Sequence, residues 1–300
     1  MGGGHSHDHG HGHAPVNHGP AFAFGVVLNL AFVGVEAVAG FLSGSMALLA
    51  DAGHNLSDVL SLALAWGASV LARRPPAGRF TYGFKSSTIL AALANAGLLL
   101  VAIGGIAFET LNRIASPPAV EGRVMMIVAG IGIAINAGTA LLFMRGRHRD
   151  LNIRGAFLHM TADALVSLGV VVAGALILST GARWIDPVTS LVIVLVIAWG
   201  TWGLLKDSVK LSLNAVPGHI DEAAVRAHLA GLPGVARVHD LHIWPMSTTE
   251  AALTAHLVMP AGHPGDGFLH GLAHDLDHSF GIEHATVQVE TGTETCEVGC

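Results

Sequence analysis

Two short stretches of the chain each place a histidine and an aspartate four residues apart among apolar neighbours. The first runs from His54 to Asp58 (HNLSD) and the second from His159 to Asp163 (HMTAD). Residues four apart lie on one face of a helix, so each stretch offers one imidazole nitrogen and one carboxylate oxygen from a single face. Two such helices packed face to face would supply two nitrogen and two oxygen ligands to one ion.

Two nitrogens and two oxygens in a compact cage match the four-coordinate, tetrahedral preference of Zn²⁺ and would also hold Cd²⁺ or Co²⁺. A polar helix-packing contact is the alternative for either pair taken singly, because His and Asp also hydrogen-bond across helices. At membrane depth each such residue costs at least roughly 2.5–3.5 kcal/mol on insertion scales, and two like pairs are hard to explain as incidental. The repeated spacing therefore predicts an intramembrane metal site.

Other polar residues fall in the same apolar segments. Asp51 and Asn55 flank the first pair and are candidate hydrogen-bond partners of the ligands, although Asp51 could equally cap or anchor its helix. For four more residues we expect hydrogen bonds inside a helix bundle: Asn29, Glu36, Asn95 and Asn136.

The helices that would carry these ligands are predicted to cross a membrane. The 300 residues are 52% hydrophobic and only 12% charged, which is more apolar than a soluble domain of this length. A spanning helix needs roughly 20 mostly apolar residues. Six segments qualify, at about 21–42, 46–72, 86–112, 123–145, 155–180 and 184–205. The sequence predicts an all-α, six-helix transmembrane bundle.

The basic residues between these segments predict the orientation of the bundle. Three lie on one face, in the connections after the third and fifth segments: Arg113, Arg123 and Arg183. Eight lie on the other: Arg73, Arg74, Arg79, Lys85, Arg145, Arg147, Arg149 and Arg154. By the positive-inside rule, the face with eight cations and both chain termini are cytoplasmic.

The last third of the chain changes character and predicts a soluble domain. A helix begins near Asp221, strands follow at 236–244 and 251–259, and a helix at 268–280 precedes a strand at 283–290. This order predicts an α+β domain of ferredoxin-like type. We therefore divide the chain into a disordered His-rich tail (1–20), a transmembrane domain (21–208), a cytoplasmic domain (209–292) and a Cys-containing tail (293–300).

Composition also excludes or favours partners. Six histidines in the first twenty residues, among Gly, Ser and Asp, are typical of a disordered segment that collects metal ions. A net charge of -6 with three lysines leaves no basic surface for nucleic acid.

Protons are a natural counter-substrate for the predicted site. With both aspartates ionised and both histidines neutral, the cage has two negative charges, which a divalent cation cancels. An empty cage at membrane depth should take up protons instead, first on histidine. Metal and protons then compete for the same groups, which suits exchange by alternating access. The sequence has no Gly-x-x-x-x-Gly-Lys phosphate loop, so we expect no nucleotide.

At these residues the chain resembles the zinc-transporting branch of the cation diffusion facilitator family. The resemblance is carried by Gly40–Asp58 (GFLSGSMALLADAGHNLSD), Tyr82-Gly83-Phe84 leading into Ile89–Ala92, the His159–Asp163 motif and His239–Trp244 (HDLHIW). It implies a homodimer in a bacterial inner membrane that exports Zn²⁺, with Cd²⁺, Co²⁺ or Ni²⁺ as other candidate substrates, in exchange for H⁺. The implied transport ligands are His54, Asp58, His159 and Asp163.

The resemblance also implies a regulatory metal site in the cytoplasmic domain near the dimer interface. His239, His256 and Glu290 fall at comparable positions, and His242, His284, Cys296 and Cys300 are further candidates. Relatives carry a basic residue and a glutamate at the start of the third helix. This sequence has Ser86 and Thr88 there, with Lys85 as the cation that could substitute.

Two other classes of function compete with transport. A metal sensor or storage protein would explain the His-rich tail, but it needs no ion site inside a helix bundle. An intramembrane metallohydrolase would need an open metal position, which four protein ligands would close. The chain also lacks a His-Glu-x-x-His helix. A secondary active Zn²⁺/H⁺ antiporter is the prediction that uses the paired motifs.

Overall fold

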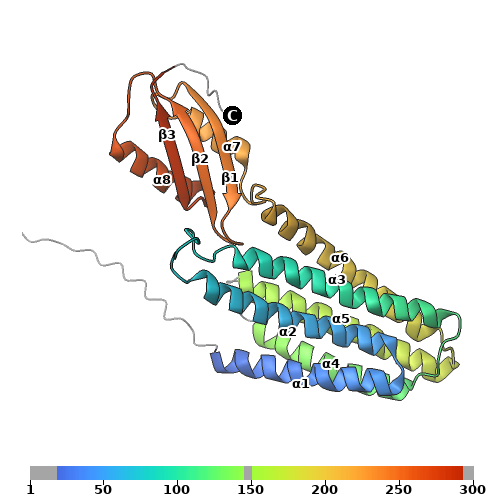
Figure 1. The fold of residues 1–300 in the computed structure, drawn as a ribbon. Helices are drawn as coiled ribbons and strands as arrows, with labels where there is room; N and C mark the ends of the chain where they lie inside the picture. The colour runs from blue at the N-terminus through green and yellow to red at the C-terminus, as the bar shows by residue number, and fades with distance from the viewer. Residues whose placement is uncertain (1–18, 145–150, 293–300) are drawn as a thin grey trace, which may run out of the picture.

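The chain folds as a bundle of long helices with a small α+β domain at one end (Figure 1). This computed structural model describes residues 19–144 and 151–292. Residues 1–18 of the predicted tail 1–20 lie outside the described residues, whereas Gly19 and Pro20 already belong to the first helix. The predicted tail 293–300, with Cys296 and Cys300, also lies outside the described residues, as do Arg145, Arg147 and Arg149. The bundle helices are α1 (Gly19–Ser43), α2 (Met46–Ala72), α3 (Ser87–Ile114), α4 (Gly122–Phe143), α5 (Leu151–Thr180) and α6 (Ile185–Ser212).

The outer surface of the bundle is apolar, as expected for a protein embedded in lipid. Helices α2 to α6 each hold a stretch long and apolar enough to cross a membrane, and the apolar part of α1 found among the described side chains, Asn29–Ser43, is shorter. Large side chains point outward, including Phe41 at 78% and Trp199 at 87% exposure. A soluble protein would not leave so much apolar surface in water. The chain is therefore an integral membrane protein with about five clear spans, and the sixth stays a prediction.

Helices α4 and α5 approach so closely that their backbones touch. A Cβ atom added at Gly122 would lie 2.7 Å from the carbonyl oxygen of Gly174, and one added at Gly174 would lie 2.9 Å from the carbonyl oxygen of Gly122. Only glycine permits both approaches, and small residues at such crossings drive helix association in membranes. The buried side chains of Leu48, Met125 and Val170 fill the core beside this contact. Helix α5 is thereby held firmly in the bundle.

A buried carboxylate fixes the start of α2. The N-cap residue Ser45 accepts a hydrogen bond from the amide of Leu48, and its hydroxyl donates to Asp186 Oδ1 over 2.5 Å. The amides of Met46 and Ala47 also donate to Asp186, over 2.8 and 3.3 Å. Free amides and the positive end of the dipole make a helix N-terminus a good site for an anion. Asp186 lies 141 residues from Ser45 along the chain, and the sequence did not point to its contact with α2.

The cytoplasmic domain has the element order that the sequence predicts. It comprises α7 (Glu222–Ala230), β1 (Arg237–Pro245), β2 (Ala251–Val258), α8 (Asp266–Phe280) and β3 (His284–Glu290). The strands lie in the order β1-β2-β3, with β1 antiparallel and β3 parallel to β2. Among the described residues the sheet is one strand short of the four in a complete β-α-β-β-α-β unit, so ferredoxin-like stays a prediction for this mixed sheet.

Alternation along β2 gives the sheet two different faces. Leu253, Ala255 and Leu257 are buried in a core shared with Leu229 of α7 and Leu276 of α8. The residues between them point to the opposite face, because successive strand residues alternate. That opposite face holds the histidines described below.

The segment from Lys85 into the first turn of α3 makes three polar contacts with the turn after β1. Lys85 forms an ion pair with Glu250, the hydroxyl of Ser86 donates to the carbonyl of Met246 over 3.2 Å, and the amide of Thr248 donates to Thr88 Oγ1 over 3.0 Å. The hydroxyl groups of Ser86 and Thr88 form hydrogen bonds at the positions where relatives were expected to carry charged side chains. Lys85 supplies the cation of the ion pair with Glu250. The turn after β1 is tied directly to the segment that follows α2.

We predict that Asp186→Ala destabilises the bundle by about 2 kcal/mol or more, because it leaves buried donors of α2 without an acceptor. Thermal unfolding in detergent would measure the loss. Asp207→Ala is the matched control, since this aspartate lies on the same helix with its side chain 72% exposed. Equal melting temperatures for the Asp186 variant and the wild type would contradict the capping role.

Candidate functional site

Helices α2 and α5 bring the four predicted intramembrane ligands together. His54 Nε2 lies 3.7 Å from Asp58 Oδ2 and 3.3 Å from Asp163 Oδ1. His159 Nε2 lies 3.4 Å from Asp58 Oδ2 and 3.6 Å from Asp163 Oδ2. Nitrogen and oxygen alternate around this ring of side chains, and the two imidazole rings are edge to face with centroids 6.2 Å apart.

The spacing of these atoms suits a tetrahedral ion. Zinc binds nitrogen and oxygen at about 2.0–2.2 Å, which puts neighbouring ligand atoms of a tetrahedron about 3.4 Å apart. The four distances of 3.3–3.7 Å are close to that value. One ligand atom each of His54, Asp58 and Asp163 lies within 4.8 Å of the others, and His159 falls outside this group. His159 must therefore move closer for all four side chains to hold one divalent cation. The ligand role itself stays a prediction.

The antiparallel course of α2 and α5 arranges the four groups in two layers. His54 faces Asp163 in the inner layer, where the side chains are 19% and 3% exposed. Asp58 faces His159 in the outer layer, where they are 28% and 42% exposed. The outer layer lies nearer the C-terminal end of α2, which leads to the contact with the cytoplasmic domain. The site is thus more open at that end of the bundle.

The polar residues beside the ligands form their own hydrogen bonds. Asp51 Oδ2 accepts from the hydroxyl of Ser167 over 3.0 Å, and Glu36 Oε2 accepts from the amide of Asn55 over 3.2 Å. Asp51 and Asn55 were candidate hydrogen-bond partners of the ligands, with anchoring of the helix as the alternative for Asp51. In the structure their hydrogen bonds link α2 to α5 and α1, which fits the anchoring alternative for Asp51.

A second cluster lies on the open face of the cytoplasmic sheet. His239 and His256 are cross-strand neighbours, and their ring centroids are 5.1 Å apart. Glu290 bridges them, with Oε2 at 2.9 Å from His239 Nε2 and Oε1 at 2.8 Å from His256 Nδ1. The hydrogen bond from His239, with a further one from His256, lowers the pKa of Glu290. The carboxylate therefore stays ionised, as a metal ligand must be.

Asp240 joins this second cluster although the sequence did not point to it. Its Oδ2 lies 3.4 Å from His256 Nε2 and its Oδ1 lies 2.8 Å from His242 Nε2. Asp240 adopts a left-handed conformation with φ of +49°, at a break in the register of β1 between His239 and His242. Aspartate tolerates that conformation better than most residues. The irregularity turns its side chain toward both histidines.

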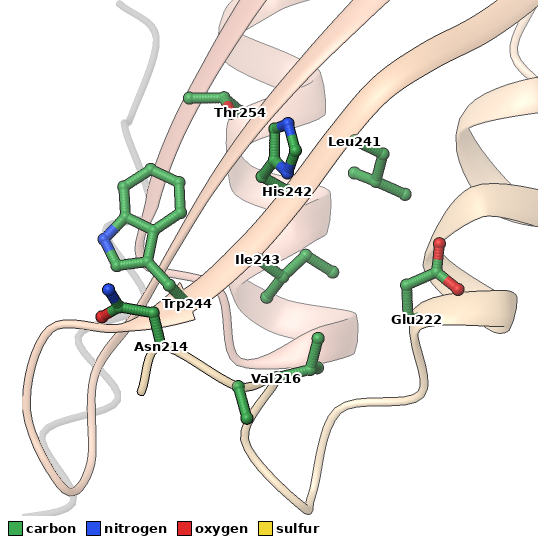
Figure 2. Close-up of a pocket in the computed structure, with 9 residues that line it drawn as sticks. Asn214, Val216, Glu222, Leu241, His242, Ile243, Trp244 and Thr254 are labelled. Carbon is green, nitrogen blue, oxygen red and sulfur yellow. The ribbon is translucent and has the colours of Figure 1, made fainter. Parts of the chain in front are cut away.

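The remaining candidates do not share one site. His242 contacts Asp240 but lines a pocket of about 670 Å³ between the sheet and the segment after α6. Figure 2 shows its ring near Trp244 on the strand, with Glu222 on the neighbouring helix. His284 lies at the start of β3, away from Glu290 at its end, and its ring packs edge to face on Tyr82 at 5.5 Å. Cys296 and Cys300 are outside the described residues.

Several curated proteins are similar to this chain over most of their length. Zinc transporter ZitB of Escherichia coli (strain K12) is 39% identical over 271 residues, which cover 90% of this chain and 86% of that protein. Metal cation efflux system protein CzcD of Cupriavidus metallidurans is 37% identical over 291 residues, covering 97% and 90%. The cadmium, cobalt and zinc/H(+)-K(+) antiporter of Bacillus subtilis (strain 168) is 36% identical over 262 residues, covering 86% and 84%.

Family comparisons match both parts of the chain. Residues 23–211 match the cation efflux transmembrane domain, and residues 217–292 match the cytoplasmic domain of cation efflux proteins. The first match spans the helices that carry the paired His and Asp residues, and the second spans the sheet with the His239–His256–Glu290 cluster. The chain is therefore a member of the cation efflux family, with the transmembrane and cytoplasmic domains of that family in order.

Proposed function

We propose that this protein exports Zn²⁺ from the cytosol in exchange for protons, through a site made by His54, Asp58, His159 and Asp163. Membership of the cation efflux family makes it a transporter of divalent metal cations rather than an enzyme. The observation that carries the proposal is the convergence of two imidazoles and two carboxylates from α2 and α5, 3.3–3.7 Å apart, inside an apolar bundle.

Charge balance explains how such a site couples metal to protons. The loaded cage of two aspartates, two neutral histidines and one Zn²⁺ carries no net charge. When the metal leaves, two uncompensated carboxylates at this depth are costly, so protons replace it. Protons arriving from outside thus expel the metal there, and zinc arriving from the cytosol expels protons. A bundle that opens alternately to each side turns this competition into exchange.

The ligand set favours zinc over other metals. Mixed nitrogen and oxygen ligands suit Zn²⁺, Cd²⁺, Co²⁺ and Ni²⁺ better than Mg²⁺ or Ca²⁺, which prefer oxygen alone. Similar proteins are named for zinc, or for cadmium, cobalt and zinc together. We propose zinc as the principal substrate, with the other three as secondary ones.

We further propose a homodimer with a regulatory metal in each cytoplasmic domain. We propose the domain limits expected from the sequence, with residues 21–208 in a bacterial inner membrane as six spans and both termini in the cytoplasm. The ligands of the regulatory ion would be His239, His256 and Glu290, with Asp240 beside them. They lie on the face of the sheet that neither α7 nor α8 covers, which leaves that face free for a partner subunit. A metal bound there would draw two cytoplasmic domains together when cytosolic zinc rises.

The transport site is tested by zinc flux into proteoliposomes under an imposed pH gradient. Loss of a mere partner of a metal ligand costs about 10–100-fold in metal affinity or activity, so Asp163→Ala should lose at least that much flux. Asp207→Ala, an exposed aspartate of α6, should transport like the wild type. If the Asp163 variant matched the wild type, or if the wild type moved no zinc, the proposal would fail.

The cytoplasmic site is tested by counting bound zinc on the purified full chain in an Asp163→Ala background, which weakens the transport site. His256→Ala should then remove one zinc per chain and weaken dimerisation in the presence of zinc, as measured by analytical ultracentrifugation. His274→Ala is the control, because its side chain is 77% exposed and lies outside the cluster. An unchanged zinc count in the His256 variant would contradict the proposed regulatory site and would not affect the proposal for the transport site.

A further inference from the structure

Two acidic side chains beside the transport site are fully buried and are not among its ligands. Glu36 of α1 and Asp51 of α2 both have 0% exposure. Asp51 precedes His54 by about one helical turn, and Ser167, which donates to Asp51, follows Asp163 by one turn on α5. The contact between Asp51 and Ser167 is therefore a third contact between α2 and α5, one helical turn beyond the layer of His54 and Asp163.

Each of the two carboxyl groups has one oxygen that no hydrogen-bond donor in the described part of the chain satisfies. Glu36 Oε2 accepts from Asn55 and Asp51 Oδ2 accepts from Ser167, which uses one oxygen of each group. The other two oxygens, Glu36 Oε1 and Asp51 Oδ1, are buried without any donor from the described residues. Asn55, which donates to Glu36, follows Asp51 by four residues, so Glu36 lies against the face of α2 that carries Asp51. Ionised carboxylates only accept hydrogen bonds, so the two unpartnered oxygens can satisfy each other only if one of them carries a proton.

The charges around the pair also favour a proton on one of the two carboxyl groups. The other charged groups that reach the pair are Asp163, another acid, and His54, which must be neutral to bind a metal. Among the described residues, no lysine or arginine compensates either carboxyl. Two ionised carboxylates in contact without water would repel each other and lose their solvation. One proton removes one charge and joins the two orphaned oxygens in a single hydrogen bond.

We propose that Glu36 is held as a neutral acid that donates to Asp51, and that this pair positions α2 for metal binding. Asp51 and Asn55 flank His54 in the sequence, and both contact Glu36, so the segment of α2 around His54 is anchored to α1. The hydrogen bond from Ser167 to Asp51 anchors the same segment to α5. Glu36 is thus a positioning residue. The proton stays in place through the cycle, because zinc or protons bound by the neighbouring cage compensate the charge of that cage.

This role in transport rests on the proposed function, but the proton itself can be observed without transport. The infrared carbonyl stretch of a protonated carboxylic acid is distinct from the bands of carboxylates. The purified full chain at neutral pH should show this band, and Glu36→Gln should lose it. Asp51→Asn keeps the acid but changes its acceptor, so the band should shift. Glu109→Gln, at an acid of α3 that is 49% exposed, should leave the band unchanged.

Zinc flux in proteoliposomes gives the second readout. Glutamine at position 36 retains a neutral donor to Asp51 and an acceptor for Asn55, so Glu36→Gln should keep most of the flux. Glu36→Ala removes both contacts and should lose about 10–100-fold, the range seen for partners of metal ligands.

Three results would overturn the inference: no acid band in the wild type, a band that neither variant of the pair alters, or a folded Glu36→Gln protein as inactive as Glu36→Ala. The last result would mean that the proton must leave during transport. A wild type that shows the band but moves no zinc would instead refute the proposed function and leave the carboxyl pair intact.

Discussion

The structure depends on the cost of keeping ionisable groups inside an apolar bundle. A charge at membrane depth is tolerated only when a partner, a proton or an ion compensates it. Helices α2 and α5 meet that requirement with three successive contacts, from Asp58 and His159 through His54 and Asp163 to Asp51 and Ser167. In the proposed mechanism the first two exchange protons for a cation, whereas the third is a hydrogen bond between α2 and α5. The same face of α2 thus carries the proposed exchange site and, one turn away, the hydrogen bond of Asp51 that holds the helix to α5.

Contacts at the two ends of α2 connect this helix to α6 and to the cytoplasmic domain. At its start, Asp186 holds the first amides of α2, so this end moves together with α6. After its other end, Lys85 and Ser86 contact the turn that follows β1 in the cytoplasmic domain. The same strand β1 contributes His239 and Asp240 to the second cluster. A rearrangement of that cluster would therefore reach the proposed transport ligands through one strand, one turn and one helix.

Local spacing explains which parts of this arrangement could be predicted from the sequence. A separation of four residues places His54 with Asp58, and His159 with Asp163, on single helix faces, and the apolar context requires that such faces meet. The order of helices and strands follows equally from hydrophobic pattern and turn residues. The link from Asp186 to Ser45 spans 141 residues, and no local pattern encodes it. Likewise, Asp240 reaches His256 only because the β1 register breaks, which alternation along a regular strand does not anticipate.

Strand register also explains why some candidate ligands of the cytoplasmic site lie together and His284 does not. Candidate ligands on neighbouring strands, such as His239 and His256, lie together because strand pairing fixes their register. His284 is on β3 as well, but it pairs with Ala252 at the far end of the sheet and packs on Tyr82 instead. A histidine therefore belongs to a site when the register of its strand brings it level with the others, whatever its distance in sequence. Position along the strand, more than residue type, separates the cluster of His239, His256 and Glu290 from His284.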